Sequence, residues 1–256
     1  MPDVSNTTVK NLEVFVLNVG RADCIIIREG THTVLIDCGE DDDGDFIVSF
    51  LKSKGISFID RLYITHFDKD HTGGSDTVLA NIKCGGVYLP FYQKTSTQYV
   101  EMMNAIFTAG LEPQYVKQND TFSLGNIQYN VFPPMDFSYQ NDEDNEFSLI
   151  ISAKYGEKSF LFTGDALNGR INESIKDLGE YDFIKMPNHG DYFKGLVDLI
   201  SKTKPKFAAI TCSIQEPAAK KTLNLLKNAS AEVFLTSNGS ICASCDGKLI
   251  NVTLID

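Results

Sequence analysis

Short apolar runs rich in β-branched residues recur along this chain and constrain its fold more than any other feature. LEVFVLN, CIIIREG and HTVLIDCG follow one another between residues 12 and 39, separated by glycine or polar turns, which is typical of adjacent strands. The stretch DFIVSFLKSKG then has helical periodicity and ends at Gly55, before FIDRLYITH returns to strand. The first quarter of the chain therefore predicts a sheet with a helix packed on it.

The same alternation continues to the end of the chain. GGVYLP, FSLIISAKYG, KSFLFTGD and YDFIKMP read as further strands, and helices are predicted near residues 76–81, 98–109, 168–178, 193–201 and 218–226. Strands followed by helices occur twice, which predicts two sheets packed face to face with helices outside. We therefore expect an α/β fold, a four-layer αββα sandwich, formed by a single domain over residues 1–256 because no linker interrupts the pattern.

The stretch YITHFDKDHTGG concentrates metal-binding chemistry on one short turn. Four potential ligands fall within six positions: His66, Asp68, Asp70 and His71. Alternate side chains of an extended segment point the same way, so the first three can converge while the last follows on the turn. Gly73 and Gly74 are expected to let the backbone turn sharply without Cβ clashes. The pattern predicts a site for one or two divalent cations; a polar surface turn is the alternative.

Two further potential ligands stand at the ends of other strand runs. FLFTGDA puts Asp165 beside a glycine where one strand ends, and KMPNHGD puts His189 in the turn after another. Each alone is an ordinary turn aspartate or loop histidine, but loops at strand ends are where functional groups gather. Together with the first cluster they complete a two-metal site in which Asp165 is the bridging carboxylate.

This set of motifs resembles the metallo-β-lactamase superfamily, whose first motif is His-x-His-x-Asp-His at the end of a strand. It is more narrowly similar to the branch found as the C-terminal domain of ComEC-type DNA-internalisation proteins and as free-standing relatives. VFVLNVGRADCIII resembles that branch's DVGQGD strand pair, VLIDCG its strand with an aspartate near the metals, and DRLYITHFDKDHTGG its His-x-Asp-x-Asp-His variant. NEFSLIISAKYGEKSFLFTGDA and DFIKMPNHGD resemble the following strand pair and the Lys-x-x-His-His-Gly-Ser turn. The resemblance implies the αββα fold and a metal centre.

The chain also departs from this branch. Asn188 stands where the branch has the first histidine of His-His-Gly, and Asp191 replaces the serine. Asn18 and the pair Arg21-Ala22 replace parts of DVGQGD, and CSIQEPAAKK lacks the histidines that the branch carries in its C-terminal Gly-His-Pro-His segment. Which metal loses a ligand is left open, and an altered rim suggests a different substrate.

The resemblance implies an assignment of ligands to two metal positions. One position takes His66, Asp68 and the bridging Asp165; the other takes Asp70, His71, Asp165 and His189. Because Asp68 replaces an imidazole by a carboxylate, the first position is harder and suits manganese or magnesium, with zinc as the other candidate. Two such cations lower the pKa of a water between them and make it a nucleophile at neutral pH.

Three residues are expected to act on the reaction itself: Asp70, Asp37 and Lys185. Asp70 lies beneath the expected open cleft. Asp37, in LIDCG, orients a ligand or water, or else is a strand-ending turn residue. Lys185, four residues before His189, neutralises a substrate phosphate, or else is a surface lysine.

Charge restricts the partners. The formal net charge is -11, and binding of long nucleic acids depends on Lys and Arg neutralising phosphates. We therefore expect a small-molecule or short oligonucleotide substrate; a long nucleic acid is disfavoured unless basic residues cluster locally. The leading hypothesis is a metal-dependent phosphodiesterase; a carboxylic ester, thioester or lactone hydrolase and a metal-stabilised binding or regulatory domain are the alternatives. Oligomeric state is not predicted.

Cellular location is inferred from the same features. The N-terminal residues do not combine a basic region with an apolar stretch, and no segment approaches eighteen apolar residues, so we expect no membrane association. Six cysteines lie mostly within apolar runs, as free thiols do in a reducing compartment. A cytoplasmic location is expected.

Overall fold

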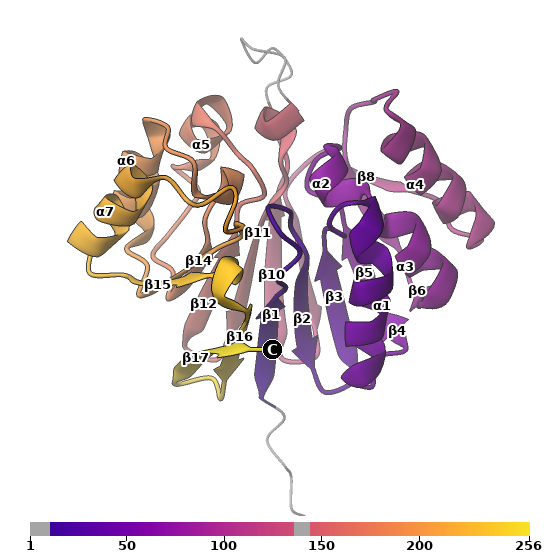
Figure 1. Cartoon of the computed structure of the whole chain (residues 1–256), viewed down its shortest axis with the longest axis horizontal. Helices are drawn as coiled ribbons and strands as arrows, with labels where there is room; N and C mark the ends of the chain where they lie inside the picture. Colours follow the sequence, from indigo (N-terminus) through magenta and orange to yellow (C-terminus); the bar gives the residue numbers. More distant parts are fainter. Residues whose placement is uncertain (1–10, 136–143) are drawn as a thin grey trace, which may run out of the picture.

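Two sheets packed face to face between two layers of helices form the structure, a computed structural model that describes residues 11–135 and 144–256. Helices α1, α3 and α4 lie on one side of the sheets and α5, α6 and α7 on the other (Figure 1). The predicted αββα sandwich is confirmed. Residues 1–10 and 136–143 lie outside the described residues, so the domain boundary at residue 1 stays a prediction.

The first sheet has eight strands and the second has seven. The first runs, in spatial order, β17 (Ile250–Ile255), β16 (Ser240–Cys245), β1 (Leu12–Val16), β2 (Ile25–Glu29), β3 (His32–Ile36), β5 (Arg61–Tyr63), β7 (Val87–Pro90) and β8 (Gln114–Val116). The second runs β15 (Glu232–Leu235), β14 (Phe207–Ile210), β13 (Phe183–Lys185), β12 (Lys158–Phe162), β11 (Ile150–Tyr155), β10 (Ile127–Phe132) and β9 (Asp120–Leu124). A separate short pair joins β4 (Phe58–Ile59) and β6 (Lys83–Cys84).

The helices fall where the sequence predicts them, with differences at their ends. They are α1 (Gly44–Ser53), α2 (Lys69–Thr72), α3 (Ser75–Asn81), α4 (Thr97–Thr108), α5 (Asn168–Ser174), α6 (Gly195–Thr203) and α7 (Lys220–Asn228). Four short 3₁₀ turns are η1 (Asp41–Asp43), η2 (Asp144–Phe147), η3 (Asn188–Gly190) and η4 (Thr236–Asn238). The helix predicted to reach residue 178 ends at Ser174. Within the described ranges, no helix has both the length and the apolar sequence needed to cross a lipid bilayer.

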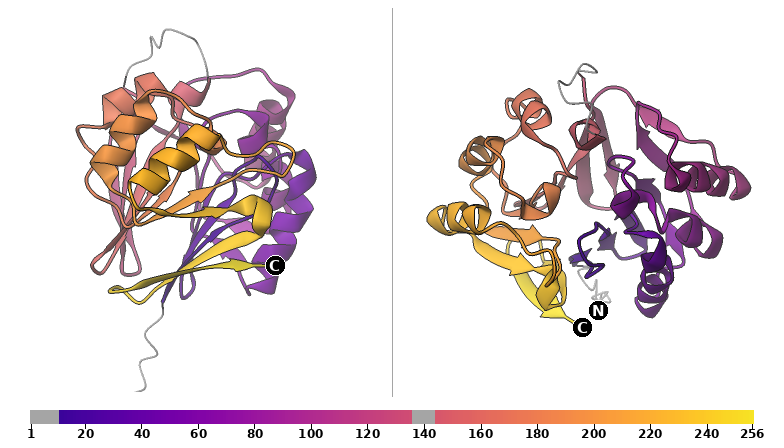
Figure 2. Two further views of the ribbon diagram at one scale, coloured as in Figure 1. Left: turned by 60° about the vertical axis from the view of Figure 1, so that its left-hand side comes forward. Right: turned by 45° about the horizontal axis from the view of Figure 1, so that its top comes forward.

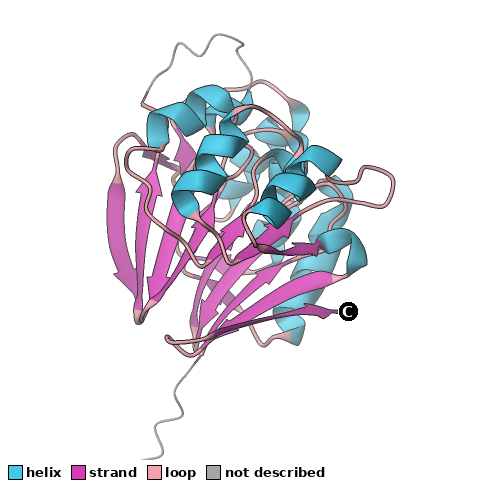
Figure 3. Cartoon of the chain, turned by 90° about the vertical axis from the view of Figure 1, so that its left-hand side faces the viewer, coloured by secondary structure: helices cyan, strands magenta, loops and turns pink. Residues whose placement is uncertain are grey.

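Alternating side chains build three apolar layers, which explains why the strands read as continuous apolar runs. In β1, Val14 and Val16 face the second sheet, while Phe15 faces the helices over the first. In β12, Phe160 points into the space between the sheets and Leu161 towards α5–α7. Figures 2 and 3 show the sheets between their helices from three further directions.

The topology gathers several strand ends at one edge. Strands β3, β5 and β7 are parallel in the first sheet, and β12 to β15 are parallel in the second. The carboxyl ends of parallel strands meet at one edge, where open α/β sheets place their functional loops. A backbone hydrogen bond of 2.9 Å from the N–H of Leu149 to the carbonyl of Thr65 ties the two sheets together there.

Candidate metal centre

The predicted ligands come from loops that follow parallel strands of both sheets. The loops after β3 and β5 and helix α2 supply one half, and those after β12, β13 and β14 supply the other. The predicted ligands are His66, Asp68, Asp70, His71, Asp165 and His189, and Asp37 and Thr211 lie beside them on the same loops. Segments far apart in the sequence therefore build one site between the sheets, at the edge that the strand order predicts.

The turn after β5 is shaped by backbone packing. Asp68 is extended and precedes the four residues of α2, which carry Asp70 and His71. Gly73 has an ordinary helical φ of -53°, so the turn does not need glycine for a left-handed conformation. A Cβ on Gly73 would instead lie 2.3 Å from the backbone nitrogen of Asp41. Glycine is needed here because another chain segment passes very close.

The carboxylate of Asp165 lies at the centre of the cluster. Its Oδ2 is 2.9 Å from Nε2 of His189 and 3.5 Å from Nε2 of His71. Nε2 of His189 is also 3.2 Å from Oδ2 of Asp70. The structure thus brings together the four residues predicted for the second metal position, and it includes His189 although Asn188 has replaced the neighbouring histidine.

Hydrogen bonds on the far side of each ring determine its tautomer. Asp37 accepts hydrogen bonds from Nδ1 of His71 at 2.8 Å and from the hydroxyl of Thr65 at 2.7 Å. The hydroxyl of Thr211 donates to Asp23 at 2.7 Å, so its lone pair accepts from Nδ1 of His189 at 3.0 Å. Both rings therefore carry a proton on Nδ1 and turn Nε2 towards Asp165, the usual arrangement for histidines that bind metals.

His66 follows the same rule. The Thr65 hydroxyl, whose proton goes to Asp37, lies 3.1 Å from Nδ1 of His66 and is left to accept. Nε2 of His66 faces Asp68, whose Oδ2 is 3.5 Å away. Ser148 lies behind the ring, 3.5 Å from Nδ1. The first predicted metal position thus has one imidazole and one carboxylate in place.

Asp23 is a site residue that the sequence reasoning missed. Among the described residues one group of four side chains is able to hold a metal ion, Asp23, His71, Asp165 and His189, with ligand atoms within 4.8 Å of one another. Asp23 lies on the Nδ1 side of both rings, however, 3.9 Å from Nδ1 of His71 and 3.7 Å from Nδ1 of His189. It contacts Thr211 and Lys185 and orients the ligands from behind. Asp70 instead faces Nε2 of His189. The aspartate that ends NVGRAD was the available signal, because it matches the last residue of DVGQGD.

Lys185 is fully buried, so the alternative of a surface lysine is wrong. Its ammonium contacts Asp23 and lies 3.3 Å from Oδ1 of Asp165. These contacts offset the negative charge of two cluster carboxylates. A contact between Lys185 and a substrate phosphate stays a prediction.

The carboxylates shift the ionisation of the cluster. Burial alone would lower the pKa of His189, but Asp165 and Asp70 outweigh burial and raise it to about 9. Burial likewise opposes the charge of His71, yet Asp165 and Asp37 raise its pKa well above the usual 6.5. The pKa of Asp70 is lowered to about 2, because the hydrogen bond from His189 and the charge of His71 overcome the effect of burial. Without metal, the cluster holds imidazolium and carboxylate groups at neutral pH.

Two departures from the resembled branch contact each other at the rim. Nη2 of Arg21 donates to Oδ2 of Asp191 at 2.6 Å. This hydrogen bond, with the carboxylates of Glu216 and Asp165 nearby, raises the pKa of Arg21.

Asn188 and His189 have left-handed φ values of 47° and 50°, a conformation that asparagine and histidine adopt more readily than most residues. The altered turn therefore aims His189 into the cluster.

A divalent cation fits this set of donors. Nε2 of His66 and Nε2 of His71 are buried and have no hydrogen-bond partner within the described residues. Leaving buried polar atoms unpaired is costly, and a cation that takes the nitrogen lone pair at the corresponding metal position removes that cost. Mixed imidazole and carboxylate donors suit zinc or manganese.

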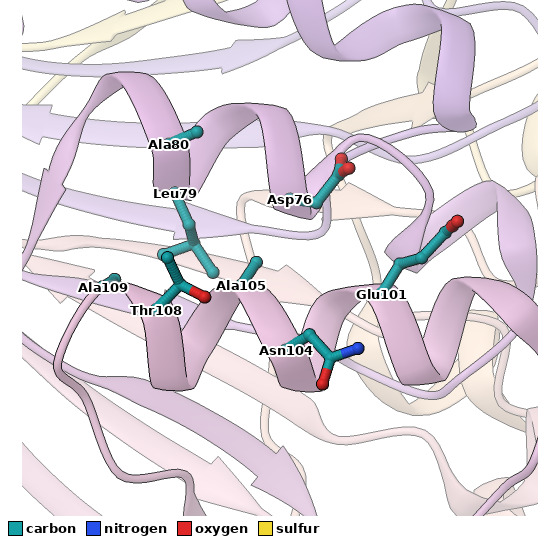
Figure 4. Close-up of a pocket in the computed structure, with 8 residues that line it drawn as sticks. All are labelled: Asp76, Leu79, Ala80, Glu101, Asn104, Ala105, Thr108 and Ala109. Carbon is teal, nitrogen blue, oxygen red and sulfur yellow. The ribbon is translucent and has the colours of Figure 1, made fainter.

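A groove lies elsewhere, away from the cluster. It occupies about 540 Å³ between α3 and α4 and is lined in part by Asp76, Leu79, Glu101 and Asn104 (Figure 4). No cluster residue lines it, and its charged side chains are both acidic. The groove therefore contributes nothing to the metal centre.

Comparisons with known proteins agree with this description. Residues 17–211 match the model of the metallo-beta-lactamase superfamily. ComE operon protein 3 of Bacillus subtilis is 26% identical over 201 residues, 76% of this chain and 26% of the relative. Recombination protein 2 of Haemophilus influenzae is 24% identical over 210 residues, 80% of this chain and 25% of the relative. The chain thus spans about a quarter of the length of these relatives.

A solved structure shows the same fold. The metallo-beta-lactamase fold protein YhfI of Bacillus subtilis superposes with a TM-score of 0.62 at 11% identity, covering 88% of this chain and 96% of that one. The fold and the site together define a metal-dependent hydrolase of the αββα class. The chain belongs to the metallo-beta-lactamase superfamily. The two curated relatives support the predicted similarity to its ComEC-type branch.

Proposed function

We propose that this protein is a metal-dependent phosphodiesterase whose substrate is a nucleotide or a short oligonucleotide. The observation that carries the proposal is the convergence of Asp70, His71, Asp165 and His189, with the Nε2 atoms of both rings turned towards Asp165. These four residues would hold a divalent ion, zinc or manganese. A bound divalent ion supplies a strong nucleophile at neutral pH and stabilises charge that develops on a phosphoryl oxygen.

The protein's own residues prepare this site. Asp37 and Thr211 each hold one ring proton on Nδ1, so Nε2 is the nitrogen that gives up its proton and offers its lone pair to a metal. Lys185, buried against Asp23 and Asp165, offsets part of the carboxylate charge. Asp70, whose side chain is 24% exposed, is the ligand open to the solvent side. These contacts order the donors before any substrate arrives.

The preference for a short anionic substrate rests on charge. Arg21 at the rim is partly exposed and, within the described part of the chain, uses one nitrogen on Asp191, so its other N–H groups are available to bind a phosphate. The net charge of -11 disfavours a long polyanion. The name of one curated relative, a recombination protein, adds weight to a nucleic-acid-derived substrate.

Hydrolysis of bis(p-nitrophenyl) phosphate tests the proposal. Protein stripped with EDTA is expected to be inactive, and Mn²⁺ or Zn²⁺ is expected to restore activity. His71→Ala should not regain activity, because it removes a ligand nitrogen. His32→Ala is the matched control. His32 begins β3 and contacts Asp60, at the end of the strand opposite to the metal centre, so its replacement should leave activity unchanged.

A parallel assay with p-nitrophenyl acetate separates the alternatives. Activity on the acetate with none on the phosphodiester would refute the proposal in favour of an ester hydrolase. Inactivity on both substrates, despite bound metal, would favour a binding or regulatory domain.

A further inference from the structure

The two predicted metal positions differ in how completely they are built. Asp23, His71, Asp165 and His189 form one compact group, and within the described residues neither His66 nor Asp68 joins a group of three or more. Ser148, the polar side chain behind His66, accepts the backbone N–H of Asp165 at 3.1 Å. The position beside His66 therefore has fewer donors than the position beside Asp165.

A lysine already occupies the carboxylate of this weaker position. Nζ of Lys94 lies 2.6 Å from Oδ1 of Asp68 and also contacts Asp144. All three side chains are only partly exposed, with fractions of 29% for Lys94, 37% for Asp68 and 19% for Asp144. The negative charge that would attract a cation to Asp68 is thus partly offset by an ammonium that Asp68 shares with Asp144.

The segment that carries Lys94 is held in place on both sides. The hydroxyl of Tyr92 accepts the backbone N–H of Phe67 at 2.7 Å, and its ring packs on Phe67 with centroids 4.4 Å apart. The other neighbour is Phe147, also 4.4 Å from Tyr92. Phe67 lies between His66 and Asp68 in the sequence, so Tyr92 anchors the chain two residues before Lys94 against the first motif.

We infer that Lys94 is a built-in counter-ion that keeps a second metal ion from binding tightly beside His66 and Asp68. One divalent ion binds strongly at Asp70, His71, Asp165 and His189. A second must either displace the ammonium or lie beside it, and both a lost ion pair and like-charge repulsion weaken its binding. The centre is therefore a one-metal site at low free metal. This inference shares the metal site with the proposed function, but its test needs no substrate.

Metal stoichiometry measures the effect. Metal-stripped protein is dialysed against a series of free Mn²⁺ or Zn²⁺ concentrations, and the bound ion per chain is counted by elemental analysis. Wild type should hold one ion over a wide range of free metal. Lys94→Met keeps the apolar stem without the charge, and it should bind a second ion at free metal about 10-fold to 100-fold lower than wild type does. Lys94→Arg should behave as wild type.

Lys69→Met is the matched control. Lys69 is the residue after Asp68, but its ammonium pairs with Glu40 and is 66% exposed. It should leave the second binding step unchanged. Two ions bound to wild type with similar affinity would overturn the inference, as would an equal shift in Lys69→Met and Lys94→Met. The ion count of wild type tests the inference even if a variant fails to fold. Wild type that binds one ion without phosphodiesterase activity would count against the proposed function and leave the counter-ion role standing.

Discussion

Replacing Asp37 by asparagine should weaken metal binding strongly, although Asp37 touches no metal. Asp37 is fully buried and accepts three hydrogen bonds, from the N–H and hydroxyl of Thr65 at 2.7 Å each and from Nδ1 of His71 at 2.8 Å. If the asparagine oxygen keeps the bond from the Thr65 N–H, its NH₂ group faces His71. That contact favours the tautomer with the proton on Nε2, the nitrogen needed for the metal.

The size of the effect follows from the lost contact. Removing a partner that orients a metal-binding histidine reduces affinity by about 10-fold to 100-fold, or about 1.4 to 2.8 kcal/mol. Because Asp37→Asn also favours the wrong tautomer of His71, we expect its loss of affinity to lie at the upper end of this range. Asp37 has a left-handed φ of 59°, which asparagine also tolerates. The substitution should therefore add no backbone strain that would itself change the metal affinity.

Competition for Zn²⁺ with a fluorescent chelator measures the dissociation constant. Asp60→Asn is the matched control, since Asp60 accepts the N–H of Thr33 at 2.7 Å and faces His32 at the opposite end of β3. Asp60→Asn should keep the wild-type constant. An unchanged constant for Asp37→Asn would refute the argument that this carboxylate fixes the tautomer of His71.

Three further outcomes are expected. The raised pKa values of His71 and His189 keep both rings as imidazolium at pH 7, so binding of one ion should release close to two protons. Isothermal titration calorimetry in buffers of different ionisation enthalpy measures the number of protons released. A result of no released protons would contradict the raised pKa values. In metal-free protein the charge of His189 stabilises the fold fully below about pH 6.5, and this contribution is lost as pH rises through about 9. Wild type should therefore lose more thermal stability across that interval than His189→Asn. Gly73→Ala should cost about 1 to 3 kcal/mol in a denaturant titration, because its Cβ would lie 2.3 Å from the nitrogen of Asp41, whereas Gly179→Ala meets no atom within 4 Å and should be nearly neutral.

The sequence predicted the layers of the fold because strand and helix periodicities are local. Alternating burial in β1 and β12, with successive residues in different apolar layers, follows directly from the runs LEVFV and KSFLF. Helix ends were less predictable: α5 ends at Ser174, four residues before the expected end at Leu178.

The candidate site was predictable where its residues cluster in sequence or match a motif. One turn carries His66, Asp68, Asp70 and His71, and the structure places all four in the candidate metal centre. The partners of Lys94 were not predictable, since no local signal indicates that the segment after β7 folds back onto Asp68. Burial of a lysine is equally invisible in sequence, which is why Lys185 allowed two interpretations.

Charge balance explains how this cluster of carboxylates is stabilised in the folded protein when no metal is bound. Three buried carboxylates, Asp23, Asp37 and Asp165, and the partly exposed Asp70 surround one buried ammonium, Lys185. Burying this excess of negative charge is unfavourable unless it is compensated. The raised pKa values of two histidines supply that compensation as protons when no metal is bound. A divalent ion then replaces these protons at the same place, so metal binding and proton release are one equilibrium, and metal affinity should rise with pH until His189 loses its proton near pH 9.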